Sequence, residues 1–160
     1  MNQLIFSSQQ SSYRAFREQL CDQVIGVDAP ARAPSSFELN ARLVQSGGSR
    51  IVSLENRGTA IEVARTCRRI ATDGEECWAV GVCLEGSQRS SFRAGHEMVT
   101  RRSELIVTHS GTPHVGTTAP RARVGLLVIP DGTPATGWSV RHSAARDGLP
   151  RVLSAEQCGG

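Results

Sequence analysis

The sequence contains no lysine, so all 18 of its basic side chains are arginines. They are scattered along the chain, and aromatic residues make up only 4% of it. A groove that binds nucleic acid directly needs clustered basic side chains, often interleaved with aromatic ones. The composition therefore argues against direct nucleic-acid binding by this chain, despite its formal net charge of +3.

Long apolar segments and an even set of cysteines are also missing. Apolar runs such as residues 124–129 are far shorter than the roughly 20 residues that span a bilayer. The N-terminus lacks the basic segment and apolar core of a signal peptide. The five cysteines are an odd number, and 160 residues can bury a core without disulfides. We therefore expect a soluble, cytoplasmic protein with no membrane contact.

Common catalytic motifs are absent as well. The sequence has no Gly-x-Ser-x-Gly elbow, phosphate-binding loop or dinucleotide fingerprint. Cys77 and Cys83 lie six residues apart on one face of a predicted strand, and the spacing suggests no cysteine–histidine pair. We interpret both thiols as small buried hydrophobic groups, and we predict no catalytic residue.

The central feature of the sequence is the segment 77–114, in which two apolar strands flank a polar return. Side chains alternate along a strand, so residues 77–85 have one bulky face, with Trp78, Val80 and Val82, and one face of small groups. Neither face is strongly polar. We therefore expect both faces of this strand to be covered.

Alternating apolar residues and Gly-containing turns recur along most of the chain. They predict about eight strands, which include residues 37–44, 51–55, 59–66, 77–85, 105–109 and 123–129. Their spacing is typical of an all-β sandwich or barrel rather than of alternating β/α units.

A short amphipathic helix is predicted before the first of these strands. Tyr13, Phe16, Leu20 and Val24 recur at helical spacing, Ser12 can cap the first turn, and a glycine at position 26 marks the end. We expect residues 1–11 to be polar and frayed. The predicted organisation is a helix and linker over 1–36, a barrel over 37–131, and a tail over 132–160 with a turn of helix near 149–153.

Several motifs carry a resemblance to a known family. Residues 103–114, SELIVTHSGTPH, resemble the second half of a cupin motif, and the segments ART (64–66), RIA (69–71), DG (73–74), EG (85–86) and LVIP (127–130) extend the match. In this order they resemble the cupin-like sensor domain at the N-terminus of AraC-type transcriptional regulators. The resemblance covers residues 16–131.

The sequence departs from that family in two ways. Ser103 and Glu104 replace the usual Gly-Asp turn, and no helix-turn-helix region follows the barrel. The resemblance implies a cupin-like jelly-roll barrel that senses a small-molecule effector and forms a homodimer. It also implies that DNA is bound only through a helix-turn-helix domain absent from this chain, and that the effector acts by shifting a population of conformations.

The candidate ligand-binding residues come from strand alternation: Arg65, Trp78, Val80, Val82, Leu105 and His109. If Ile61 and Val63 point into the barrel, Arg65 does so too, and its guanidinium can bind an anionic effector. The alternative, which we favour, is an ion pair with a nearby acid such as Glu85 or Glu62. Trp78 can either stack on a ligand or belong to the core.

A metal site is not expected. His114 lies where metal-binding cupins have a histidine ligand, but those proteins also use a His-x-His pair and a glutamate, and this chain has no His-x-His. We therefore predict no metal and no cofactor. Alternatives to a sensor remain: a free-standing cupin-type enzyme, such as an isomerase or dioxygenase, a small-molecule-binding protein, and a pure oligomerisation module with a filled barrel.

Overall fold

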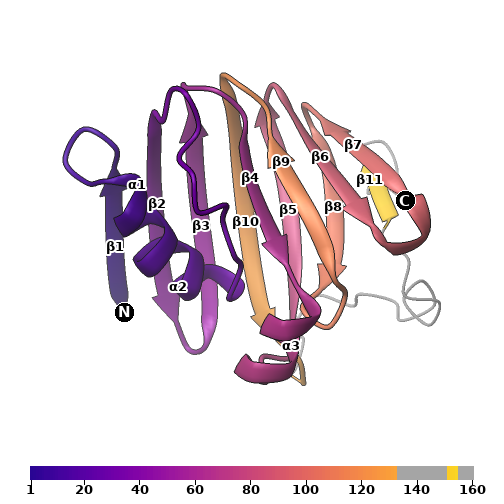
Figure 1. Cartoon of the computed structure of the whole chain (residues 1–160). Helices are drawn as coiled ribbons and strands as arrows, with labels where there is room; N and C mark the ends of the chain where they lie inside the picture. Colours follow the sequence, from indigo (N-terminus) through magenta and orange to yellow (C-terminus); the bar gives the residue numbers. More distant parts are fainter. Residues whose placement is uncertain (133–150, 155–160) are drawn as a thin grey trace.

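Two antiparallel sheets face each other in the computed structural model of the chain, which describes residues 1–132 and 151–154 (Figure 1). The larger sheet contains, in spatial order, β1 (Asn2–Ser7), β2 (Leu39–Ser46), β3 (Ser49–Asn56), β10 (Ala122–Pro130), β5 (Cys77–Glu85), β8 (Glu104–His109) and β11 (Arg151–Ser154). The smaller sheet contains β4 (Ile61–Arg65), β9 (His114–Thr118), β6 (Ser87–Phe92) and β7 (Glu97–Arg101). A 3₁₀ turn, η2 (Arg93–Gly95), joins β6 to β7.

The order of the strands is that of a jelly roll. Strands β3, β10, β5 and β8 of the larger sheet face β4, β9, β6 and β7 of the smaller one. Between β3 and β10 the chain passes from one sheet to the other at every connection except that from β6 to β7, so strands distant in sequence, such as β3 and β10, pair with each other. The predicted fold class, a mainly β jelly-roll barrel with a short N-terminal helix, is confirmed.

The predicted helix is present and runs without a break from Tyr13 to Ile25. It consists of α1 (Tyr13–Ala15), a π-helical segment η1 (Phe16–Leu20) and α2 (Cys21–Ile25). The Ser12 hydroxyl accepts a hydrogen bond from the Ala15 backbone N–H, and Gly26 ends the helix in the left-handed conformation. The helix lies beside the smaller sheet and covers the part of the larger sheet that contains β1–β3 (Figure 1).

The expectation that residues 1–11 are frayed is wrong. Residues 2–7 form strand β1, which pairs in antiparallel fashion with β2. Phe6 is only 3% exposed, and its ring lies 6.1 Å from that of Phe16 in the helix. The alternation of Leu4 and Phe6 is a strand pattern that packs under the helix, and it was hidden by the polar residues around it.

Two further connections differ from expectation. The charged segment after β4 forms a helix, α3 (Cys67–Asp73), which the Thr66 side chain caps by accepting a hydrogen bond from the Arg69 N–H. Residues 151–154 form strand β11 rather than the predicted helical turn. Most of the predicted tail over 132–160 lies outside the described residues, and the predicted divisions at residues 36 and 131 stay predictions.

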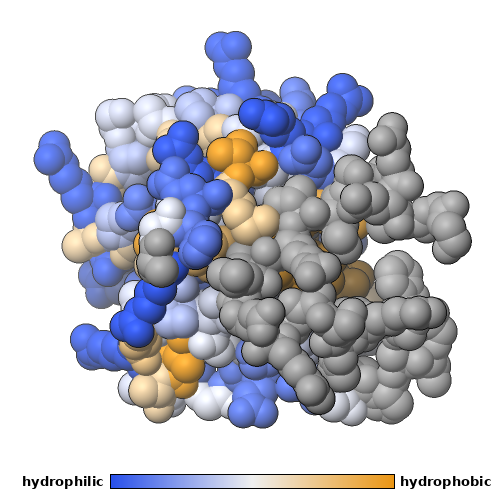
Figure 2. Space-filling model, turned by 90° about the vertical axis from the view of Figure 1, so that its right-hand side faces the viewer, coloured by the Kyte–Doolittle hydropathy of each residue, from blue (hydrophilic) through white to orange (hydrophobic). Residues whose placement is uncertain are grey.

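The core lies between the two sheets and under the helix. In β5 the small residues face inward: Cys77, Ala79 and Cys83 are buried, while Trp78, Val80 and Val82 on the other face are partly exposed. In the side view of Figure 2, the described hydrophobic residues form small patches among hydrophilic ones. None of the described helices is long and apolar enough to cross a membrane.

Candidate functional site

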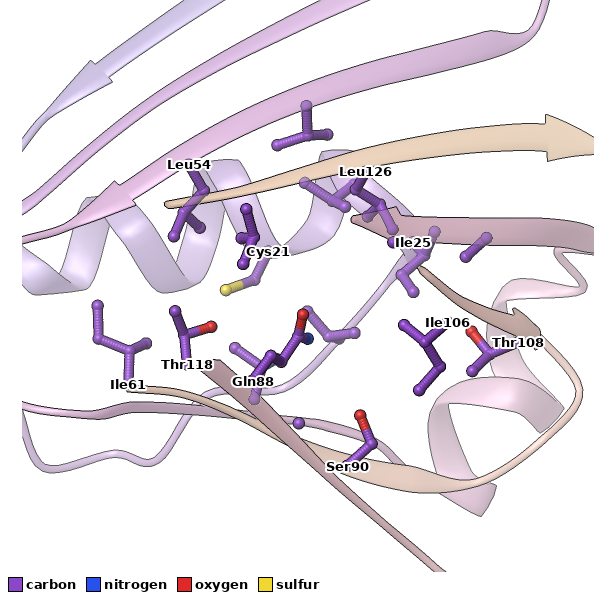
Figure 3. Close-up of a pocket in the computed structure, with 18 of the residues that line it drawn as sticks. Cys21, Ile25, Leu54, Ile61, Gln88, Ser90, Ile106, Thr108, Thr118 and Leu126 are labelled. Atoms are coloured by element: carbon purple, nitrogen blue, oxygen red, sulfur yellow. The ribbon is translucent and has the colours of Figure 1, made fainter. Parts of the chain in front are cut away.

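A cavity of about 140 Å³ lies between the two sheets, and the N-terminal helix covers one side of it (Figure 3). Most of its wall is aliphatic or aromatic. The helix and the larger sheet contribute mainly apolar groups, which include Phe16, Leu20, Val24, Ile25, Val52, Leu54, Ala79, Ile106 and Leu126. The jelly roll is therefore not filled by its own side chains, in contrast to the expectation for a pure oligomerisation module.

The smaller sheet supplies most of the polar groups of the wall. Gln88 and Thr118 are direct neighbours across β6 and β9, and Ser90 lies opposite Gly116 in the same pair of strands. Figure 3 shows the side chains of Gln88, Ser90 and Thr118 pointing from this sheet toward the middle of the cavity. Thr108 of β8 adds a further hydroxyl at one end. The cavity thus has one polar wall and one apolar wall.

His114 closes the polar wall at the start of β9. Its Nδ1 lies 2.9 Å from the backbone oxygen of Thr112, and its ring lies 5.5 Å from that of Phe92. Since the backbone oxygen can only accept, Nδ1 carries the proton and Nε2 is the free acceptor. Burial lowers the pKa of His114 below its ordinary value of 6.5. The imidazole is therefore neutral at pH 7.

The one ionisable group that the helix adds to the wall is also neutral. Cys21 is 2% exposed, and burial raises the pKa of its thiol to about 12. No Arg, Asp or Glu is among the described residues that line the cavity. At pH 7 the described wall carries no net charge.

Arg65 lies at one end of the barrel, outside the cavity wall. It shares the inner face of β4 with Ile61 and Val63, and it is 1% exposed. Its Nε donates to the Ser110 backbone oxygen at 2.9 Å and its Nη1 to the Gly26 backbone oxygen at 2.8 Å. Both Nη atoms also pair with the Asp73 carboxylate, which lowers the pKa of Asp73. The favoured alternative, an ion pair, is therefore the one seen, but with Asp73 rather than Glu85 or Glu62.

The other predicted ligand-binding residues lie on the far side of the larger sheet from the cavity. Trp78, Val80 and Val82 occupy the outer face of β5, and Leu105 and His109 occupy the outer face of β8 beside them. Trp78 and His109 are in contact, with ring centroids 4.8 Å apart. The sequence left open which face of this strand lines a cavity, and in the structure the small face, with Ala79 and Gly81, does so. A ligand contact by these residues stays a prediction.

The residues that sequence reasoning missed are Gln88, Ser90 and Thr118. Their signal was present as alternation: Gln88, Ser90 and Phe92 share one face of β6, and the last two of them are buried. A polar strand with one buried face is unusual, because burying hydroxyl and amide groups is costly unless they are hydrogen-bonded. Polar residues at the inner positions of a barrel strand therefore indicate a site.

The donor set for a metal ion is not present in the described part of the chain. Within residues 1–132 and 151–154, no three His, Cys, Asp or Glu side chains converge so that they could hold a metal ion. His114 binds the Thr112 oxygen, and His109 faces Asp131 at 3.7 Å on the other side of the sheet.

Comparison with known proteins places the fold. No protein-family model matches the sequence, and no curated protein matches it significantly. Among solved structures, the chain is similar to the AraC-like transcriptional activator CuxR, with a TM-score of 0.64 and 18% identity. This chain therefore shares the fold of the matched part of CuxR, in agreement with the resemblance noted in the sequence. The matched region covers 81% of this chain and 47% of CuxR, so the chain spans about half the length of that regulator.

Two other solved structures are more distant. An RmlC-like cupin from Desulfovibrio desulfuricans has a TM-score of 0.45 and 20% identity, over 63% of this chain and 90% of that one. KdgF from Halomonas sp. has a TM-score of 0.44 and 15% identity, over 64% of this chain and 87% of the other.

Proposed function

We propose that this chain is the effector-sensing domain of an AraC-type transcription regulator. The observation that carries the proposal is the cavity between the two sheets, with an apolar wall, a polar wall and a helix that covers one side. Ligand pockets are mostly apolar with a few placed polar groups, as this one is. The fold shared with CuxR, which is described as an AraC-like transcriptional activator, supports the regulatory role.

The mechanism that we propose is a population shift through the helix that covers the cavity. Phe16, Leu20 and Ile25 line the cavity, so a ligand contacts the helix directly. The end of this helix is tied to the barrel by the hydrogen bond from Arg65 to Gly26. A ligand that binds one position of the helix more tightly than another stabilises that position and changes the surface offered to a partner.

The proposal includes a homodimer, a cytoplasmic location and no direct DNA binding by these 160 residues. The four described cysteines, Cys21, Cys67, Cys77 and Cys83, are free, which supports a reducing compartment. Sedimentation equilibrium tests the dimer: a single species at 17.2 kDa over the micromolar range contradicts it. An electrophoretic mobility-shift experiment tests DNA binding: if the isolated chain retards operator DNA at physiological salt, the expectation that it does not bind DNA is wrong.

The experiment that tests sensing uses a variant with a smaller cavity. Gly116 lines the cavity, and a Cβ placed there comes no closer than 3.7 Å to any neighbouring atom, so Gly116→Val adds side-chain volume without a clash at Cβ. Small-molecule extract of the source cells is fractionated, and each fraction is tested for a rise in melting temperature. We expect at least one fraction to stabilise the original chain but not the variant. If no fraction acts, or if all act equally on both proteins, the sensing proposal fails.

A further inference from the structure

The polar wall of the cavity has an unusual property: its hydrogen-bonding groups have no protein partner. Gln88, Ser90, Thr108 and Thr118 donate and accept no side-chain hydrogen bond among the described residues, and the Nε2 atom of His114 has none either. Ser90 is only 3% exposed and Thr118 only 9%. These groups face the open space of the cavity, so their hydrogen-bonding capacity is available to a ligand bound there.

The register of the smaller sheet gathers these groups in neighbouring rows. Ile61, Thr118, Gln88 and Thr100 follow one another across four strands, and Val63, Gly116 and Ser90 form the next row. The Thr100 hydroxyl, completely enclosed, also lacks a partner among the described residues. Each row therefore changes from apolar at β4 to polar at β6. Apart from Thr108 at one end, the hydrogen-bonding groups of the sheets that a ligand meets in this cavity lie on the side of the smaller sheet.

The charge of the wall restricts the ligand further. The one fully buried cation of the neighbourhood, Arg65, is saturated by Asp73 and two backbone oxygens. The burial that keeps His114 and Cys21 neutral leaves no opposite charge for an ionised ligand. Enclosing an unpaired ion in such a site is very unfavourable. The cavity thus excludes carboxylates and phosphates, including the anionic effector that Arg65 suggested.

The volume sets the size of the ligand. A cavity of about 150 Å³ lined by aliphatic and aromatic groups is known to take up benzene. The cavity in this chain is about 140 Å³, so it has room for one six-membered ring with a small substituent. A sugar of similar size needs hydrogen bonds on all sides, and the apolar wall formed by Leu54, Ile106 and Leu126 supplies none.

We propose that the cavity binds a small uncharged molecule of one ring that carries a single hydroxyl group, with the ring against the helix and the larger sheet and the hydroxyl directed at Gln88, Ser90 and the Nε2 of His114. This inference rests on the proposed sensing function and names its ligand class. Phenol is the simplest probe of this class. It is uncharged at pH 7, since its pKa is near 10, as for the tyrosine side chain.

The test is calorimetric titration of the 160-residue chain at pH 7 with phenol, toluene, benzoate and glucose. We expect phenol to bind with a stoichiometry of one, and toluene to bind about fivefold more weakly because it forms no hydrogen bond. Benzoate is expected to bind at least about 100-fold more weakly than phenol, and glucose not at all. Gly116→Val, once shown to melt cooperatively, is expected to lose phenol binding.

Variants of β6 locate the polar group of the ligand. Gln88→Leu is expected to weaken phenol binding about fivefold and to leave toluene binding unchanged. Ser90→Ala and Ser91→Ala form a matched pair, because Ser90 faces the cavity and Ser91 lies on the opposite face beside Glu97. We expect the first to weaken phenol binding and the second to have no effect.

Several outcomes overturn the inference. It fails if phenol does not bind, if benzoate or glucose binds more tightly than phenol, or if Gln88→Leu and Ser90→Ala leave the preference for phenol over toluene unchanged. If benzoate or glucose binds and Gly116→Val abolishes that binding, the ligand class is wrong while the sensing proposal stands. The sensing proposal itself fails only by the extract experiment described above, so the two failures are distinguishable.

Discussion

Two regions inside the same barrel differ in whether their polar side chains have hydrogen-bond partners within the protein. At one end, Arg65 is completely enclosed, and its guanidinium donates to Gly26, Ser110 and Asp73. In the cavity, the side chains of Gln88 and Ser90 have no partner among the described residues. The first region uses its polar groups to hold the helix, β4 and the loop after β8 together. The second keeps its polar groups free, which is what a ligand site requires.

This difference shows why charge alone is a poor guide to a site. An arginine at the end of an inward-facing strand suggested an anion site, but a buried cation is stable only when its hydrogen bonds are satisfied. The three connections that meet around Arg65 satisfy them. Leaving a neutral amide or hydroxyl group without a hydrogen bond costs less free energy than leaving a charged group without one. Neutral groups can therefore stay unpaired in the free protein and bind a ligand when it enters.

The largest effect is expected from removing the counter-ion of Arg65. Asp73→Ala leaves a fully buried guanidinium without its carboxylate, and it is expected to lower the free energy of unfolding by about 3 kcal/mol. Urea denaturation measures the change. Glu18→Ala is the control, because Glu18 forms an exposed ion pair with Arg14 that solvent screens, so its loss is expected to have little effect. Equal effects of both substitutions contradict the structural role of the Arg65 network.

The second prediction concerns Gly26, which lies against the hydrogen-bonded pair of Arg65 and Asp73. Gly26 and Gly74 both end helices at positive φ, 59° and 61°. A Cβ on Gly26 meets the Asp73 carboxylate and approaches Arg65 Nη1 to 2.9 Å, whereas a Cβ on Gly74 has nothing within 4 Å. We expect Gly74→Ala to cost about 1 kcal/mol from backbone strain alone, and Gly26→Ala at least about 2 kcal/mol. Similar melting temperatures for the two variants would falsify the close packing around Gly26.

The third prediction compares two threonines with opposite expected signs. The Thr66 hydroxyl caps α3, so Thr66→Val is expected to destabilise the protein by about 1 kcal/mol. The Thr100 hydroxyl is enclosed without a partner among the described residues, so Thr100→Val is expected to stabilise it by up to about 1 kcal/mol. Chemical denaturation of both variants decides the matter. If Thr100→Val destabilises the chain, the polar row of the smaller sheet is hydrogen-bonded in solution.

The smallest effect is a dependence of stability on pH. The pKa of His114 is lowered by burial, so the folded chain binds this proton less readily than the unfolded chain does. The contribution of His114 to stability is complete above its ordinary pKa of 6.5 and is lost as pH falls through its lower folded value. Asp73, whose pKa is lowered by hydrogen bonding to Arg65, acts in the same direction below pH 3.8.

The measurement is the melting temperature between pH 7.5 and 5 for the original chain and for His114→Gln. We expect the original chain to lose more stability on acidification than the variant does. His109→Gln is the control, because His109 lies on the outer face of the sheet beside Trp78. If His109→Gln removes the slope and His114→Gln does not, the assignment to the cavity histidine is wrong.

Much of the fold could be predicted from the sequence, because the patterns that indicate helices and strands are local. The spacing of Tyr13, Phe16 and Leu20 predicted the helix, and alternation with glycine turns predicted most strands and the jelly-roll class. The site was not readable to the same degree. Trp78 and Val80 were chosen from strand alternation alone, yet the inner face of β5 carries the small residues Ala79 and Gly81, which leave room for the cavity.

The sequence by itself determined the N-terminal helix, most of the strands, and the inward position of Arg65 on β4. Only the tertiary structure decided which face of β5 points inward, because both faces are apolar and alternation cannot distinguish them. It also decided the partner of Arg65. Asp73 reaches it only because α3 folds back over the end of the barrel, and such a meeting depends on the path of the whole chain rather than on any local pattern.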